Sequence, residues 1–467
     1  MPQMLTRVTV YVTIYWAVCT MRVHCDDLPG VYTLHSKPGL PKVVYLDFGG
    51  NNLNLDETCW GTGGVCGPVN YERQRVEYIW SVVAEAYSPF EVDITTEYVG
   101  GNNDFILRSN ASDEKYGIRV LFSPCAVPLL PDKGGVTGYA GIYDRIDDQR
   151  ECPILMNTNV LNPCKCFLAR AATHEVGHAF GLSHMRYRSP DGNTFQEYYE
   201  GIPPPPGCLS WAPVMGNCYI TNLMRFSNGE YPGFLHGNSD ALAVMATFVP
   251  YTPDDAPNTA PGLDLQIGPN LTYTFKGCIS NSADQDWFRV GAAAGTMSVT
   301  VSVAWPTSPL DIDLTLTQDS TSVGTLQKTF LRGPTWPYYD SFGPTVVSYD
   351  VSTAGYFDII VKGQGCGTGA TGGYNAYGSI GTYTLTILVT APWSPTTTTP
   401  AQTTTPTPNT NTAQTTTPTP NTTTAQTTTP TPTPTPTVTP TSSTALYATA
   451  AAVAGMLVLS VVAFTLL

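Results

Sequence analysis

Charged side chains are scarce in this sequence, and basic ones are scarcer than acidic ones. Only 12% of the 467 residues are Asp, Glu, Lys or Arg, about half the usual fraction, and 36 acidic residues outnumber 22 basic ones. This balance excludes a phosphate-binding surface, so no nucleic-acid partner is expected. Apolar residues are not scarce: 42% are hydrophobic and 11% aromatic, enough for the cores of two or three domains.

The N-terminal segment is typical of a secretory signal. One basic residue, Arg7, precedes an uncharged run from Val8 to Thr20 that is short for a bilayer span. We assign residues 1–25 to this signal, with cleavage after Cys19 or after Cys25; a buried N-terminal helix is the alternative. The 12 cysteines agree with an oxidising compartment.

No charged residue follows Lys362, and the chain ends in two segments of biased composition. Residues 395–444 are almost entirely Thr and Pro with a 12-residue repeat, which predicts a disordered, mucin-like O-glycosylated stalk. Residues 445–467 are apolar and uncharged. Because small Ser442 and Ser443 precede this tail, we expect a glycolipid (GPI) anchor signal, with a transmembrane helix as the alternative. Both place the protein on the extracellular face of a membrane.

A proline-rich break near residues 250–262 separates two predicted domains, 40–250 and 262–390. The first combines strand patterns with helical spacing, which predicts an α+β domain; the second has only short strand patterns between turns, which predicts an all-β sandwich. The strands expected in the first domain are 43–48, 91–97, 118–122, 138–143 and 154–157, and the helices are 76–87, 167–180 and 239–248. The strands expected in the second are 297–303, 312–317, 346–351, 356–361 and 383–389.

Three of the six histidines fall within 11 residues, in the segment His174-Glu175-Val176-Gly177-His178-Ala179-Phe180-Gly181-Leu182-Ser183-His184. His174 and His178 are four residues apart on a predicted helix, so both rings leave one face. Gly181 can end that helix and bring His184 round as a third nitrogen ligand. Three protein ligands with one open position are typical of a catalytic zinc site, and Glu175 beside them is expected to act as the general base.

This segment resembles the metzincin zinc endopeptidases, which share H-E-x-x-H-x-x-G-x-x-H and a methionine-containing turn below the metal. Met215, in Trp211-Ala212-Pro213-Val214-Met215-Gly216-Asn217, matches that turn and is expected to form the floor of the site. Residues 71–96 and 211–231 are similar to secreted microbial members. Some metzincins place a zinc-binding tyrosine two residues after the methionine; Asn217 stands there, and the nearest tyrosine is Tyr219.

The second domain resembles the bacterial pre-peptidase C-terminal domain, through residues 282–290, 310–314 and 381–386. Four acidic residues in two of these segments could bind calcium, which prefers oxygen ligands, or could be solvated turn residues. They are Asp284, Asp286, Asp311 and Asp313.

Short spacing predicts disulfides between Cys59 and Cys66 and between Cys208 and Cys218, the latter beside the Met215 turn. The predicted sandwich holds only two cysteines, Cys278 and Cys366, which we expect to pair. The remaining four have three possible pairings among themselves, with a thiolate zinc site as the alternative. They are Cys125, Cys152, Cys164 and Cys166. Glycosylation sequons begin at Asn110, Asn270 and Asn421.

These features together predict a surface-tethered zinc endopeptidase that acts on proteins or peptides outside the cell. Two other classes stay open. A zinc hydrolase of a non-peptide bond could use the same chemistry, although the metzincin-like turn favours proteolysis. In an adhesive ectoprotein the sandwich would be the functional module and the metal site a relic.

Overall fold

The computed structural model describes residues 33–98, 107–131, 133–138, 141, 143, 145–146, 150–159, 164–235, 240–267, 271–305, 307–331 and 340–393. The predicted signal, stalk and apolar tail lie outside these ranges, as do Asn270 and Asn421. No helix among the described residues combines the length and the apolar character needed to cross a bilayer. Both predicted domains belong to one compact unit, Met1–Thr397.

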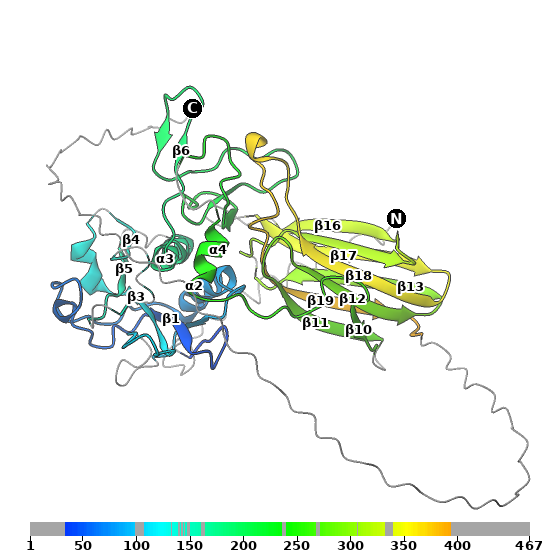
Figure 1. Cartoon of the computed structure of the whole chain (residues 1–467), viewed down its shortest axis with the longest axis horizontal. Coiled ribbons are helices and arrows are strands. Elements are labelled where there is room, and N and C mark those ends of the chain that lie inside the picture. Colours follow the sequence, from blue (N-terminus) through cyan, green and yellow to red (C-terminus); the bar gives the residue numbers. More distant parts are fainter. Residues whose placement is uncertain are drawn as a thin grey trace, which may run out of the picture. The chain divides into compact units, whose positions relative to one another are not determined.

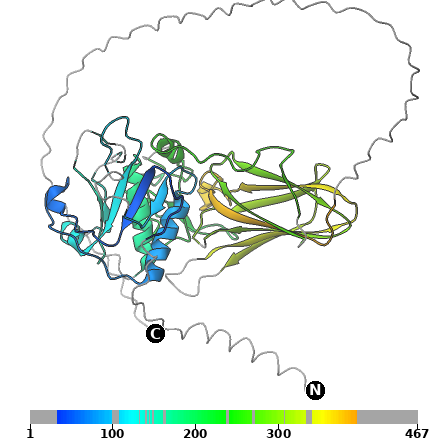
Figure 2. The same cartoon turned by 90° about the horizontal axis from the view of Figure 1, so that it is seen from below.

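The first domain is built on a five-stranded sheet (Figure 1 and Figure 2). The strands are β1 (Lys42–Asp47), β2 (Asp93–Thr95), β3 (Tyr116–Phe122), β4 (Gly135–Val136) and β5 (Ile154–Met156), in the order β2-β1-β3-β5-β4. Every neighbouring pair is parallel except β4 with β5. Residues of β1, β3 and β5 are almost entirely buried, as parallel strands covered on both faces require.

Helices α2 (Arg73–Ala86) and α3 (Lys165–Ala179) pack against each other beside this sheet. The spacing that predicts α2 reflects its buried face, which includes Val76, Ile79 and Val83. Helix α3 is buried on nearly every side and is rich in alanine, which allows close packing. The last helix, α4 (Ala241–Ala246), begins at Asp240, whose carboxylate accepts from the Ala243 backbone N–H at 3.0 Å. Two 3-10 helices, η1 (Leu55–Glu57) and η2 (Pro124–Leu129), lie in loops.

The edge strand predicted at 138–143 is misplaced, because β4 lies earlier, at Gly135–Val136. The residues between 138 and 143 that the structure describes are not in a strand. Tyr143 is instead buried, with its ring 4.5 Å from that of Phe180 and 5.5 Å from that of Tyr116. Its apolar character therefore reflects core packing rather than strand pairing.

Between α3 and α4 the chain is mostly irregular and contains two short strand pairs. Strands β6 (Tyr187–Arg188) and β7 (Phe195–Gln196) are antiparallel, whereas β8 (Trp211–Pro213) and β9 (Leu223–Arg225) are parallel. Because β8 leads directly into Met215, the β8–β9 pair fixes the start of the methionine turn.

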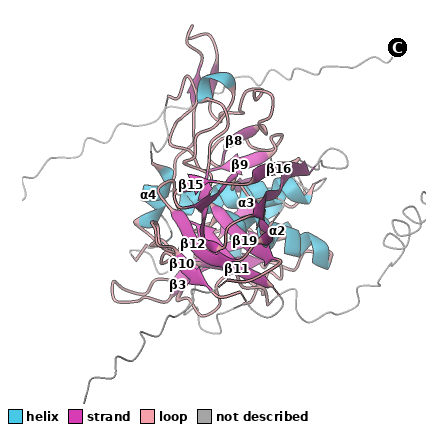
Figure 3. Cartoon of the chain, turned by 90° about the vertical axis from the view of Figure 1, so that its right-hand side faces the viewer, coloured by secondary structure: helices cyan, strands magenta, loops and turns pink. Residues whose placement is uncertain are grey.

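The second domain is a β-sandwich of two five-stranded sheets, as the sequence predicts (Figure 1 and Figure 3). Its core is formed by alternating residues such as Val299 and Val301, whose neighbours in the strand are less buried. One sheet has the order β10 (Leu263–Leu265), β12 (Gln285–Ala292), β18 (Gly355–Gly363), β14 (Ile312–Gln318), β15 (Thr321–Ser322). The other has the order β11 (Thr272–Ile279), β19 (Gly381–Val389), β13 (Gly295–Val303), β17 (Ser341–Val351), β16 (Thr325–Leu331). A 3-10 helix, η4, spans Gly369–Thr371.

The two domains have separate cores but a shared, buried junction. Phe342, Tyr374 and Ile380 of the sandwich lie in the core of the first domain. Glu85 of α2 is 3% exposed, and its carboxylate accepts from Ser308 Oγ at 2.5 Å and from both the backbone N–H and the hydroxyl of Thr382. Burial raises the pKa of Glu85. The proline-rich break is thus a change of architecture rather than a flexible hinge.

The three predicted cysteine pairings are wrong. The observed disulfides are Cys59–Cys152, Cys66–Cys125, Cys164–Cys166 and Cys208–Cys366, and Cys218 and Cys278 are free. Of the four cysteines expected to pair among themselves, only Cys164 and Cys166 do so.

The observed pairings join segments that the tertiary fold brings together. Cys66 meets Cys125 because β1 and β3 are neighbours, so the loops that follow them lie side by side. Cys366 does not pair with Cys278, because both face the first domain at different places. Cys278 Sγ is 3.9 Å from Ser88 Oγ, whereas Cys366 is bonded to Cys208 across the junction.

Candidate metal centre

The three motif histidines come from α3 and the turn that follows it. His174 and His178 project from one face of the helix, with ring centroids 4.9 Å apart. The helix ends at Ala179, and Gly181 just beyond it has a φ of +82°, a conformation that favours glycine. The reversal brings the His184 ring to within 4.8 Å of the His178 centroid and 5.4 Å of the His174 centroid.

Each histidine is fixed through its Nδ1 atom. His174 Nδ1 lies 2.7 Å from the Val214 carbonyl oxygen, and His178 Nδ1 lies 2.7 Å from the Leu182 carbonyl oxygen. His184 Nδ1 lies 2.9 Å from Glu197 Oε1. A carbonyl oxygen can only accept, so His174 and His178 carry their proton on Nδ1 and present an unprotonated Nε2.

The Nε2 atoms converge on one point, and this arrangement fits a cation. One nitrogen from each ring lies within 4.8 Å of the others, and the Nε2 atoms of His178 and His184 are 3.0 Å apart. Two imidazole nitrogens at this distance are held together by a proton or by a metal cation between them. Burial lowers the pKa of His174 to about 3 and lowers that of His178, so both rings stay neutral, as metal ligands must be. Three histidine nitrogens are a common ligand set for catalytic zinc.

Glu175 lies beside this cluster with a raised proton affinity. Its Oε2 accepts from Thr137 Oγ1 at 3.0 Å, and the same hydroxyl is 2.7 Å from the Glu175 backbone oxygen. Burial raises the pKa of Glu175 to about 7, against the lowering effect of the Thr137 bond. A carboxyl group with that pKa can both accept and return a proton near neutral pH.

Met215 is buried under α3. A Cβ at Gly177 would lie 2.6 Å from Met215 Sδ, so only glycine at that helix position admits the thioether. The Met215 backbone oxygen accepts from the Met185 N–H at 2.8 Å, which ties this turn to the segment that follows His184. Met215 therefore supports the ligand helix from below, at the position expected from the sequence.

An open cleft of about 630 Å³ lies over the three histidines and Glu175. Both residues of edge strand β4 line it, so a stretch of sheet edge faces the cleft. The cleft is also lined by Tyr198, Asn217 and Tyr219. Burial raises the pKa of Tyr219, and Asn217 Oδ1 is buried without a hydrogen-bond partner among the described residues.

Three neighbours of the cluster were not found by sequence reasoning. Glu197 binds His184, Thr137 binds Glu175, and Tyr198 places its ring 4.3 Å from that of His184. The Glu197 carboxylate also accepts from Arg186 Nη2 at 2.7 Å. None of them has a fixed spacing from the motif, because a loop or a separate strand carries each one.

The four acidic residues proposed for calcium do not lie together. Asp284 and Asp286 do, and they are joined by Asp254 from the linker between the domains, with oxygens within 4.8 Å of one another. Asp311 instead binds Lys328, Gln364 and Tyr374, and Asp313 pairs with Lys362 at 3.5 Å. Asp311 and Asp313 were therefore wrong as partners of this cluster.

One oxygen of each buried acid in this cluster has no partner. Asp284 Oδ1 and Asp286 Oδ1 are buried without hydrogen bonds among the described residues. Their other oxygens are satisfied, Asp284 Oδ2 by the Ser280 N–H at 2.7 Å and Asp286 Oδ2 by the Tyr383 hydroxyl. Burial, with further acids nearby, raises the pKa of Asp286 to about 8.

The one sequon that the structure describes is accessible. Asn110 is exposed, and its Oδ1 accepts from the Ser112 backbone N–H at 2.9 Å and the Ser112 hydroxyl at 2.6 Å. This is a surface turn, the kind of site that glycosylation requires.

Comparison with known proteins gives little beyond this geometry. No protein-family model matches the chain, and no curated protein matches it. A pre-peptidase C-terminal domain of a collagenase from Bacillus anthracis shows 13% identity over 27% of this chain and 92% of that chain, with a TM-score of 0.18. PliG from Aeromonas hydrophila, a periplasmic inhibitor of g-type lysozyme, shows 10% identity over 27% and 93%, with a TM-score of 0.17. Any function must therefore be argued from the side chains.

Proposed function

We propose that the chain is an extracellular zinc-dependent endopeptidase with a metzincin-like catalytic domain. The observation that carries the proposal is the convergence of three imidazole nitrogens beside the buried carboxyl group of Glu175. The motif sequence, the methionine turn under the helix and the parallel sheet with one antiparallel edge strand all agree with it.

His174, His178 and His184 would hold the zinc ion. When bound, zinc supplies Lewis acidity, which lowers the pKa of a water toward about 7 and polarises a peptide carbonyl. Glu175 accepts the proton of the attacking water and returns it to the leaving amine, while Thr137 keeps its carboxylate in place. Glu197 orients the His184 ring through its Nδ1 atom.

The cleft suits an extended peptide. Strand β4 has one neighbour, β5, among the described strands, and its residues Gly135 and Val136 face the cleft. An extended substrate can add to such an edge through main-chain hydrogen bonds. This favours peptide hydrolysis over hydrolysis of another bond, and a complete ligand set favours an active enzyme over a relic site in an adhesin.

We also propose that Asp254, Asp284 and Asp286 hold a calcium ion where the linker meets the start of β12. The two unpartnered buried oxygens support this, because calcium takes oxygen ligands and would satisfy both. The ion would tie the linker to β12 and would have a structural role.

The test of the protease proposal is cleavage of a peptide library by the purified ectodomain, with and without a zinc chelator. Glu175→Ala should keep the metal and lose about 10²- to 10⁴-fold in turnover, because it removes the base and no ligand. His178→Ala should lose both metal and turnover. A matched control is His35→Ala, since His35 binds Asp93 and Glu97 and not the cluster. Normal cleavage by Glu175→Ala, or no zinc in the wild type, would refute the proposal.

A further inference from the structure

Arg225, the last residue of β9, is a fully buried arginine without an acidic partner among the described residues. It is 0% exposed and forms no salt bridge with a described carboxylate, and the nearby charge of Glu230, also in the first domain, only favours its charged form. Its Nη1 donates to the Pro309 carbonyl at 3.0 Å and its Nη2 to the Asn375 carbonyl at 3.4 Å. Burying a charge in this way is costly, so a residue that only filled space would be apolar.

Among the described residues, the groups that hydrogen-bond to the guanidinium or stack on it belong to the β-sandwich. Pro309 and Asn375 lie in two sandwich loops, and the guanidinium lies 4.0 Å from the centre of the Tyr374 ring. The Tyr374 hydroxyl donates to Asp311 Oδ2 at 2.8 Å, so the ring has a fixed position. The side chain of Arg225 is thus a connection from the first domain to the second.

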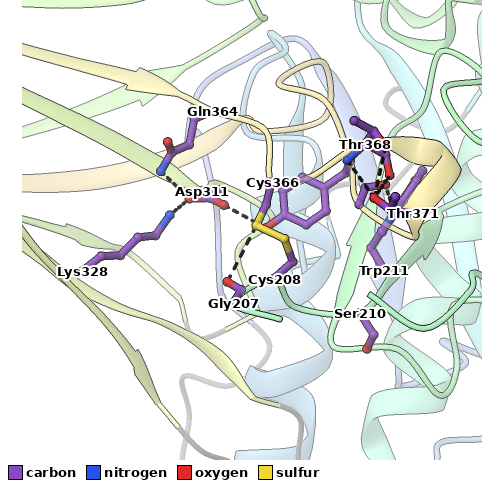
Figure 4. The surroundings of a disulfide bond; sticks show 12 residues. Gly207, Cys208, Ser210, Trp211, Asp311, Lys328, Gln364, Cys366, Thr368 and Thr371 are labelled. Atoms are coloured by element: carbon purple, nitrogen blue, oxygen red, sulfur yellow. Dashed lines mark hydrogen bonds and ion pairs between the residues drawn. A yellow bond between two sulfur atoms is a disulfide. The ribbon is translucent and has the colours of Figure 1, made fainter. Parts of the chain in front are cut away.

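Both loops are also attached to the first domain, the Pro309 loop through the hydrogen bond from Ser308 Oγ to Glu85 and the Asn375 loop at two points (Figure 4). The Cys208–Cys366 disulfide crosses the junction, and the Trp211 indole N–H donates to the Gly373 carbonyl at 2.9 Å. On the sandwich side, Asp311 is bound by Lys328 and by Gln364. The loops that receive Arg225 are therefore held from both sides.

The backbone of Arg225 leads to the metal cluster in two hydrogen bonds. The Arg225 carbonyl accepts from the Val214 N–H at 2.8 Å, next to the β8–β9 pairing of Pro213 with Arg225. The Val214 carbonyl in turn accepts from His174 Nδ1 at 2.7 Å. The carbonyl that sets the tautomer and the rotation of the His174 ring thus belongs to Val214, the residue whose backbone N–H is held by the Arg225 carbonyl.

We propose that Arg225 is a positioning residue, through which the β-sandwich holds the Val214 carbonyl that orients His174. The sandwich is then part of the support of the metal centre rather than an independent module. This inference rests on the proposed zinc site, since it concerns how a ligand of that site is held.

The test compares the full ectodomain with its Arg225→Met and Arg225→Lys variants. Two readouts are the rate of zinc release to a chelator and the visible spectrum of the Co²⁺-substituted protein. Loss of a partner that orients a ligand typically weakens metal binding about 10- to 100-fold, so we expect at least about tenfold faster release and a changed spectrum. Lysine keeps the charge but cannot reach two carbonyls and stack on Tyr374, so it should behave like methionine. kcat should fall with little change in KM, because Arg225 does not line the cleft.

A second variant and a control separate positioning from folding. Tyr374→Leu acts from the sandwich side, touches no ligand and should shift both readouts in the same direction. Arg119, on β3, is another buried arginine and is bound to Asp47 and Glu151. Arg119→Met should lower the melting temperature and leave the Co²⁺ spectrum unchanged. Unchanged release and spectra in the Arg225 and Tyr374 variants of a zinc-binding wild type would overturn the inference. So would equal changes in Arg119→Met. A wild type that binds no zinc would instead refute the proposed function.

Discussion

Without calcium, the folded ectodomain should lose stability as the pH rises from about 4 to 8. The group responsible is Asp286, which is 0% exposed and whose pKa is raised by burial from 3.8 to about 8. A carboxyl group whose pKa is higher in the folded state contributes stability that is fully present below the unfolded pKa. That contribution is lost as the pH rises through the folded pKa. At about 1.4 kcal/mol for each tenfold change in proton affinity, the shift from 3.8 to about 8 corresponds to about 6 kcal/mol.

Calcium should reduce this loss of stability, because it binds the ionised carboxylates and competes with protons. An ion at 100 times its dissociation constant adds about 2.7 kcal/mol to the free energy of unfolding. The gain should be small at pH 5 and largest near pH 8, where Asp286 ionises readily. Asp255, whose pKa is raised by burial to about 6, adds to the pH dependence in the same direction.

The assay is urea unfolding of the zinc-loaded ectodomain at several pH values, with and without added calcium. Asp286→Asn should abolish both the calcium response and most of the pH dependence. Asp313→Asn is the matched control, since Asp313 pairs with Lys362 outside the cluster and its loss should leave the calcium response intact. Constant stability from pH 5 to 8 without calcium would refute the reasoning about the buried carboxyl. A calcium effect that survives Asp286→Asn would place the ion elsewhere.

Four further predictions concern other parts of the chain. Glu197→Ala should weaken zinc binding about 10- to 100-fold, as competition with a chromophoric chelator would show, because His184 loses its orienting partner; unchanged affinity would contradict this role. Glu85→Ala should lower the free energy of unfolding by at least about 2 kcal/mol, since three buried donors lose their acceptor; a change under 0.5 kcal/mol in chemical denaturation would argue against it. Non-reducing peptide mapping should recover Cys208 joined to Cys366, and a linked Cys366–Cys278 peptide would show the junction to be wrong. Phosphatidylinositol-specific phospholipase should release the protein from cells; protein that stays bound and yields a peptide from residues 445–467 would instead indicate a membrane-spanning tail.

The parts of the site that the sequence predicts are those encoded locally. His174, His178 and Glu175 share one helix, and a single glycine turn places His184, so spacing alone brings them together. The alternation of buried and exposed residues that predicts the sandwich strands is local as well, which explains why all five predicted strands match observed ones.

The parts that could not be predicted depend on which segments become neighbours. Glu197 reaches His184 only because an irregular loop returns over the cluster. Asp254 lies in the linker, about 30 residues before Asp284 and Asp286, which it joins. Asp311, which belongs to the sandwich as those two residues do, is instead bound by Tyr374 at the domain junction. The predicted disulfide pairings are wrong for the same reason, since cysteine pairing follows tertiary contact and not sequence spacing.

The free thiol of Cys278 gives the domain junction a chemical consequence. Burial raises the pKa of Cys278 to about 12, so the thiol stays protonated while the sandwich covers Ser88. Because only a thiolate attacks a disulfide, the docked chain is protected from exchange even in an oxidising compartment. A chain whose domains have not yet docked would expose this thiol to solvent. Docking therefore also shields the Cys278 thiol, and so closes one route by which the disulfides of a newly made chain could be reshuffled.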